Sequence, residues 1–237
     1  MQTQIGTHDI TRVQAKQQAS TVFLAKVFNW MAVGLALTGA VAYLVAASGL
    51  AVSLIASPLF FILVLVELGL VFFLSARIDQ MQPATATAIF VGYSALNGVI
   101  LSTIFLIYTH ASIAATFLVT AGMFAAMAIY GMVTKRDLSG MGSFMFMGVI
   151  GIILASMVNI FLQSPALYWA ISAIGVFVFV GLTAYDVQKI KNIGEQGIMS
   201  QGEAAIRKGA IIGALALYLD FINLFLMLLR FFGGSRD

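Results

Sequence analysis

The chain has 237 residues, of which 61% are hydrophobic and only 9% are charged. Soluble domains are typically about 45–50% apolar and about 25% charged, so this composition indicates an integral membrane protein. The net charge of +3 is spread over short connections without a basic run, which argues against nucleic-acid binding. The absence of cysteine excludes disulfides, thiolate catalysis and cysteine metal sites.

The first 22 residues are polar and form a predicted cytoplasmic tail, which precedes a transmembrane domain over residues 23–232. A transmembrane helix needs about 20 mainly apolar residues. Seven stretches meet this requirement, and the three prolines, Pro58, Pro83 and Pro165, fall at starts of stretches, where helices tolerate proline. We therefore predict an all-α integral membrane protein, a bundle of seven transmembrane helices that cover residues 27–47, 58–76, 84–108, 112–133, 144–162, 166–185 and 210–229.

Lysine and arginine are divided unequally between the two sides of the predicted bundle. With the N-terminus inside, ten of the 12 cations lie on the inner side, and only Arg230 and Arg236 lie outside. Cytoplasmic loops of membrane proteins carry the excess of cations, so we predict a multi-pass protein with a cytoplasmic N-terminus. If the last segment were re-entrant, those two arginines would also be inside, and the sequence leaves this open.

The second span carries two charged residues. Glu67 lies in its middle and Arg77 at its inner end. Because a carboxylate in hydrocarbon is costly, Glu67 either belongs to an ion or proton pathway or hydrogen-bonds to Asn97 or Asn159, which lie deep in the third and fifth spans. Arg77 is either an interfacial anchor or a counter-ion for a buried aspartate.

The last two spans each contain one aspartate. Asp220 lies ten or more residues into the seventh span, about 15 Å deep at a rise of about 1.5 Å per residue. It belongs to a small, polar stripe with the three-and-four spacing of one helix face, so it faces protein or water rather than lipid. The stripe consists of Gly209, Gly213, Ala216, Asp220, Asn223 and Met227. Asp186 lies at the inner end of the sixth span, one turn before Lys189. A solvated ion pair between Asp186 and Lys189 is the simpler interpretation of this position.

Two carboxylates in consecutive spans indicate a proton or cation device. At the predicted depths Asp186 and Asp220 do not meet between straight helices, so their pairing requires tilt, a protruding seventh helix or an aqueous inner vestibule. The connection between the two spans, residues 188–209, is the longest polar connection and the expected mobile loop.

Four stretches carry a resemblance to a known family. They read TKRDLSGMG at 134–142, NIFLQSPAL at 159–167, TAYDVQKIK at 183–191 and LYLDFINLF at 217–225. From about residue 20 onward the sequence resembles the bacterial branch of the Bax inhibitor-1, or transmembrane BAX inhibitor motif, family.

This resemblance implies a seven-helix fold with the C-terminal helix at its centre, in a bacterial inner membrane. It also implies a pH-sensitive calcium leak, with Asp186 and Asp220 as the sensor and Arg77 as a latch. Calcium is then a transported ion, with no cofactor and no enzymatic activity. Calcium prefers several oxygen ligands, so the two aspartates with Asn223, backbone carbonyls and water are expected to form a weak transit site.

Three other functions remain open. An intramembrane aspartyl protease would share the Tyr185–Asp186 dipeptide, but Asp220 follows LYL at 217–219 rather than the glycine motif of such enzymes. A proton-coupled transporter would use the same carboxylates. A regulatory protein that binds a membrane protease or acts in a stress response would use the polar tail as its interacting part. The oligomeric state is left open.

Overall fold

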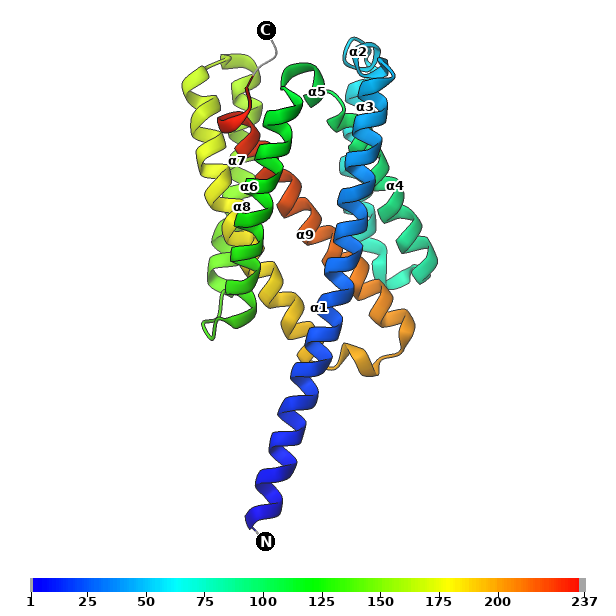
Figure 1. Ribbon diagram of the computed structural model, residues 1–237, viewed down its shortest axis with the longest axis vertical. Helices are drawn as coiled ribbons and strands as arrows, with labels where there is room; N and C mark the ends of the chain where they lie inside the picture. Colours follow the sequence, from blue (N-terminus) through cyan, green and yellow to red (C-terminus); the bar gives the residue numbers. More distant parts are fainter. Residues whose placement is uncertain (1, 235–237) are drawn as a thin grey trace.

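The computed structural model describes residues 2–234, with the side chains from Gln14 onward. All regular elements in this part are helical (Figure 1). In chain order they are α1 (Gln2–Ala47), α2 (Leu50–Ile55), α3 (Leu59–Arg77), η1 (Ile78–Gln80), α4 (Pro83–Leu101), α5 (Ile104–Ile107), α6 (His110–Val133), α7 (Ser139–Leu162), α8 (Pro165–Glu195), η2 (Ile198–Ser200) and α9 (Glu203–Phe232). Seven of them are long and apolar enough to cross a membrane, which confirms the predicted fold class.

The C-terminal helix α9 is the centre of the bundle, as the family resemblance implied. It crosses the bundle obliquely (Figure 1) and packs against α1, α4, α6 and α8. Its most apolar stretch is 72% buried, the largest share among the seven spans. By contrast, α3 packs mainly on α4 and α7 mainly on α8, so these two helices cover α9 less closely.

The connection between the last two spans is much shorter than expected. We predicted a mobile polar loop over residues 188–209, but α8 continues to Glu195 and α9 begins at Glu203. Between them lie only residues 196–202, which include η2. Hydropathy marks where the chain leaves the apolar layer, whereas the α8 helix continues because its polar end contains no proline and is bonded to the rest of the bundle.

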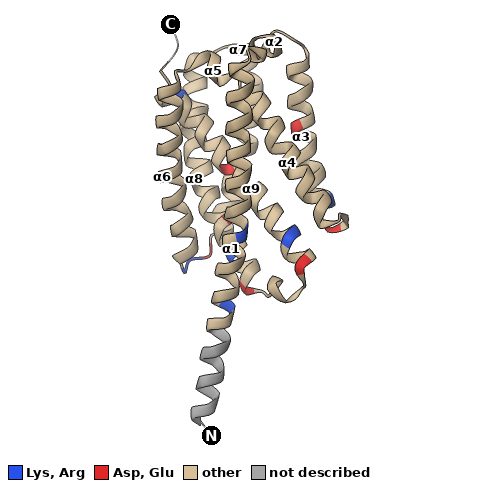
Figure 2. Ribbon diagram, turned by 45° about the vertical axis from the view of Figure 1, so that its right-hand side comes forward, with Lys and Arg blue, Asp and Glu red and all other residues tan. Residues whose placement is uncertain are grey.

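The predicted tail is not a separate segment, because α1 begins at Gln2 and runs without a break into the first span. The helix projects beyond the others (Figure 1), and the side chains of residues 14–18 are all exposed. Ser20 begins the packed part, since it is buried and its hydroxyl donates to the Lys191 carbonyl at 2.9 Å. Most of the charged residues among those described lie toward this end of the bundle (Figure 2), which we call the basic end.

Glycines allow α6 and α7 to approach α8 closely. A Cβ added at Gly131 of α6 would collide with the backbone carbonyl of Ala184, and one added at Gly142 of α7 would lie 2.5 Å from the Tyr185 ring. Small residues favour such approach in lipid, where helix association depends on van der Waals packing. These contacts flank Asp186 and fix α8 against both neighbours.

We predict that Gly131→Ala lowers stability by about 1–3 kcal/mol, because the added methyl group meets a backbone atom that cannot move aside easily. The measurement is thermal unfolding of the purified protein in detergent. Gly122→Ala is the matched control on the same helix, since nothing lies within 4 Å of a Cβ at that position. Alanine favours a helix interior over glycine, so the control should be neutral or stabilising. Equal midpoints for both variants would contradict the predicted close contact.

Candidate functional site

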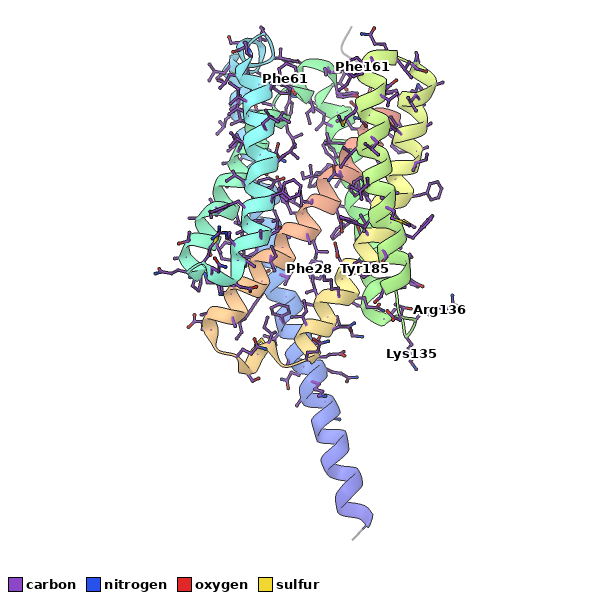
Figure 3. The ribbon with its side chains drawn as sticks, turned by 180° about the vertical axis from the view of Figure 1, so that it is seen from behind. Phe28, Phe61, Lys135, Arg136, Phe161 and Tyr185 are labelled. Atoms are coloured by element: carbon purple, nitrogen blue, oxygen red, sulfur yellow. The ribbon has the colours of Figure 1, made fainter. Side chains whose placement is uncertain are left out.

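A cavity of about 880 Å³ lies among α3, α7, α8 and α9. In Figure 3, which views the molecule from behind, α9 is visible between α3 and α7, and the labelled Tyr185 lies toward the basic end. Most of the lining is aliphatic or aromatic. The polar side chains that line the cavity are Ser75, Ser143, Tyr185, Asp186, Lys189, Asp220 and Asn223.

The structure brings Asp186 and Asp220 together at this cavity. Their carboxyl groups are close enough to interact with one another, and we call them the aspartate pair. The depth mismatch expected from straight helices is removed because α9 is strongly inclined (Figure 1) and α8 continues past Asp186. The first of the three expected arrangements, a tilted helix, is therefore present in α9.

Asp220 is 4% exposed, and its Oδ2 atom has no hydrogen-bond partner within the described residues. A hydrogen bond between two carboxyl groups requires a proton on one of them, because ionised carboxylates only accept. Within the described part of the chain, the one ion pair closer than 4.0 Å is Lys191–Glu195. The predicted Asp186–Lys189 ion pair is thus not a close one, and the aspartate pair is suited to hold either a proton or a cation.

Lys189 nevertheless acts on Asp186 electrostatically. Its side chain is exposed, and Nζ lies 5.9 Å from the centre of the Tyr185 ring. Lys189 therefore places a positive charge beside the cavity on the Asp186 side. Asp220 is buried and interacts with the Asp186 carboxyl group.

The predicted small, polar stripe of α9 divides into two parts. Ala216, Asp220, Asn223 and Met227 all line the cavity. In the part nearer the basic end, a Cβ at Gly213 would contact Val27 of α1, so that part packs against another helix. The Asn223 side-chain amide donates to the Leu219 carbonyl at 2.8 Å, which leaves its Oδ1 atom as an acceptor beside the aspartate pair.

Glu67 and Arg77 lie apart from the aspartate pair. Asn97 Nδ2 donates to Glu67, which is one of the two alternatives expected for this carboxyl group, and Tyr93 also interacts with it. Asn159 is not among the described hydrogen-bond partners of Glu67, and its Oδ1 accepts from the Ser164 backbone at 3.0 Å. Arg77 is exposed and donates to Gln80 at 3.0 Å, so the implied latch to an aspartate is not formed in this structure.

Two polar side chains near the site were missed by the sequence reasoning. Buried Gln188 accepts from the Leu138 backbone at 2.9 Å and donates to the Arg136 carbonyl at 2.8 Å, which fastens the α6–α7 connection to α8. The one available signal was that both partners fall within the family stretches 134–142 and 183–191.

Tyr218 is the second missed residue, and it is fully buried two positions before Asp220. Its hydroxyl lies 2.7 Å from the Thr38 hydroxyl, which donates its only proton to the Ser94 carbonyl at 2.8 Å. Tyr218 is therefore the donor to Thr38. This hydrogen bond ties α9 to α1 on the side away from the cavity.

The described part of the chain contains no group of three or more His, Cys, Asp or Glu side chains placed to hold a metal ion. The aspartate pair alone supplies two carboxylates, fewer oxygens than calcium prefers. A cation there would take its remaining ligands from Asn223, backbone carbonyls and water. Such a site is suited to weak, transient binding.

Because the chain has no cysteine, introduced cysteines can test whether the two carboxyl groups meet. We expect Asp186→Cys and Asp220→Cys, placed in one chain, to be joined by a short bifunctional thiol reagent. A protease site inserted within residues 196–202 then separates α8 from α9, and only linked fragments stay together on a denaturing gel.

The control for this test pairs Asp220→Cys with Asp79→Cys. The Asp79 carbonyl accepts from Lys208, which precedes Asp220 by about three helical turns, so this pair should not be linked. Complete separation of the fragments in the Asp186–Asp220 variant would show that the two side chains do not meet.

Comparison with known proteins agrees with the sequence resemblance. A family model described as inhibitor of apoptosis-promoting Bax1 matches residues 20–237. The inner membrane protein YbhL of Escherichia coli strain K12 is 55% identical over 216 residues, which cover 90% of this chain and 92% of that protein. Uncharacterized proteins of Deinococcus radiodurans and Borreliella burgdorferi are 47% and 45% identical, over 96% and 97% of this chain and 96% and 99% of those proteins. The chain therefore belongs to the Bax inhibitor-1 family of membrane proteins.

Proposed function

We propose that this protein is a pH-sensitive calcium leak channel in which the aspartate pair is the sensor. The observation that carries the proposal is the contact between Asp186 and Asp220 at a cavity, with one buried Asp220 oxygen that no described group satisfies. A buried polar atom without a partner is rare in folded proteins and calls for an explanation. A proton or a passing cation provides that explanation.

In the proposed mechanism, protons and calcium compete for the aspartate pair. When both carboxyl groups are ionised, they attract a divalent cation to the cavity, and Asn223 adds a neutral oxygen. Protonation removes part of this charge, so the pair no longer attracts the cation. Two carboxylates and few further ligands give weak binding, and conduction requires an ion to leave as readily as it enters.

The proposed orientation places the N-terminus and the basic end in the cytoplasm. It rests on the excess of lysine and arginine in the connections at that end. The aspartate pair then lies closer to the cytoplasmic ends of α8 and α3 than to the outer surface. Arg77, at the same end, is proposed to latch an aspartate in a conformation other than the one described above.

Asp220→Asn is predicted to abolish pH-dependent calcium flux into liposomes that contain the purified protein. The amide keeps the size of the side chain but can neither release a proton nor supply the negative charge that attracts a cation. Flux is measured with an internal calcium dye at two pH values. Asp137→Asn, which changes an exposed carboxylate in the α6–α7 connection, is the matched control and should keep the pH response.

Unchanged flux and pH response in Asp220→Asn would reject the proposed sensor. The same liposomes separate a leak from a proton-coupled transporter. A leak only dissipates the calcium gradient, whereas a transporter accumulates calcium against its gradient when a proton gradient is imposed.

A regulatory role has one observation in its favour, the projecting part of α1. The side chains of residues 14–18 are all exposed, and the hydrogen bond recorded to this segment, from the Thr21 hydroxyl to the Gln17 carbonyl, lies within α1 itself. We predict that removing residues 1–18 leaves calcium flux unchanged and abolishes co-purification with a partner membrane protein such as a protease. Retained co-purification would show that the projecting segment is not the binding element.

A further inference from the structure

The cavity opens sideways between α3 and α7. Three of its lining residues, Leu68, Phe146 and Ile153, are also among the exposed apolar side chains, at 52%, 62% and 54% exposure. Leu68 lies near the middle of α3, and the other two lie within α7, away from both of its ends. Because both helices span the membrane, this opening faces lipid tails rather than water.

The wall and the floor of the cavity differ in chemistry. The wall at the opening is hydrocarbon, from Leu68, Phe146 and Ile153. The floor is lined by the aspartate pair and Asn223, which carry acceptor oxygens, and the unpartnered Asp220 Oδ2 is itself buried. An ammonium group has three donors and no acceptor, so it complements this floor, whereas a phosphate or carboxylate head group would be repelled by it.

We propose that the cleft between α3 and α7 binds a single-chain amphiphile with a primary ammonium head group, which enters from the bilayer. Its tail packs on Leu68, Phe146 and Ile153, and its ammonium group donates to Asp186 and Asp220. The volume of about 880 Å³ lies within the range of about 300–1,000 Å³ typical of small-molecule sites.

Among the described residues that line the same cavity, Lys189 is the one cation, and it restricts where the ligand can bind. Its ammonium group lies over the Tyr185 ring and is exposed at the basic end. A second ammonium group is therefore expected on the Asp220 side of the pair, where the unpartnered oxygen lies. This is also the side that a tail entering at mid-span can reach.

The test uses a long-chain primary amine that carries a diazirine near the end of its tail. The full chain is reconstituted in phosphatidylcholine nanodiscs, illuminated with the probe and analysed by mass spectrometry. We expect adducts on the α3 and α7 residues that line the opening. Excess dodecylamine should compete for the same site and reduce these adducts by at least about tenfold, whereas dodecanol, which has no ammonium group to complement the carboxylates, should leave them unchanged.

Asp220→Asn should reduce the adducts by about tenfold, and Asp137→Asn, the exposed control, should label as the unaltered chain does. Circular dichroism and gel filtration confirm that each variant folds, and Asp186→Asn replaces Asp220→Asn if the latter does not. Three outcomes would overturn the proposal. Dodecanol could displace the probe, or labelling could survive Asp220→Asn. Alternatively, a photoreactive phosphatidylcholine could label the cleft equally well without being displaced by dodecylamine. In the last case an ordinary lipid tail occupies the cleft.

This inference does not depend on calcium conduction. The labelling is measured without any ion flux, so a negative result leaves the proposed leak standing. Loss of the proposed leak would likewise leave an amine site in the cleft.

Discussion

The cost of placing the Asp220 carboxyl group inside a membrane governs the arrangement of helices around it. An aspartate at the centre of a spanning helix costs about 2.5–3.5 kcal/mol on insertion scales. Four helices shield α9 from lipid, and its inclination brings Asp220 to Asp186 rather than to an apolar neighbour. The remaining two, α3 and α7, leave a cavity beside the pair. Shielding, inclination and cavity thus belong to one arrangement, in which the Asp220 carboxyl group is enclosed by helices and lies beside a cavity.

Hydropathy was sufficient to predict the seven spans, because each needs a long apolar stretch and the polar connections are short. It could not predict that α8 continues to Glu195, since a change to polar residues marks the membrane boundary and not the end of a helix. The Glu67–Asn97 hydrogen bond was predictable, because two deep polar groups in neighbouring spans need partners. The contact between Asp186 and Asp220 was not, because depth counted along a straight helix ignores inclination.

The contributions of Gln188 and Tyr218 depend on distant parts of the chain. Gln188 bonds to residues 50 and 52 positions earlier, and Tyr218 bonds to a residue 180 positions earlier. An amide or a hydroxyl in an amphipathic or apolar stretch has no periodic pattern that identifies its partner. Local sequence therefore indicates that such a group must be satisfied, but only the tertiary packing determines by what.

The hydrogen bond from Tyr218 to Thr38 limits how the aspartate pair can come apart. Tyr218 and Asp220 are two residues apart, so at about 100° per residue they project to nearly opposite sides of α9. The helix is thus fastened to α1 on one side and to α8 on the other. Rotation of α9 about its axis breaks both attachments at once, whereas a displacement of α8 breaks only one. Because Gln188 bonds α8 to the α6–α7 connection, a displaced α8 carries that connection with it. In the proposed channel, protonation of the pair would reach the surface of the bundle by this route.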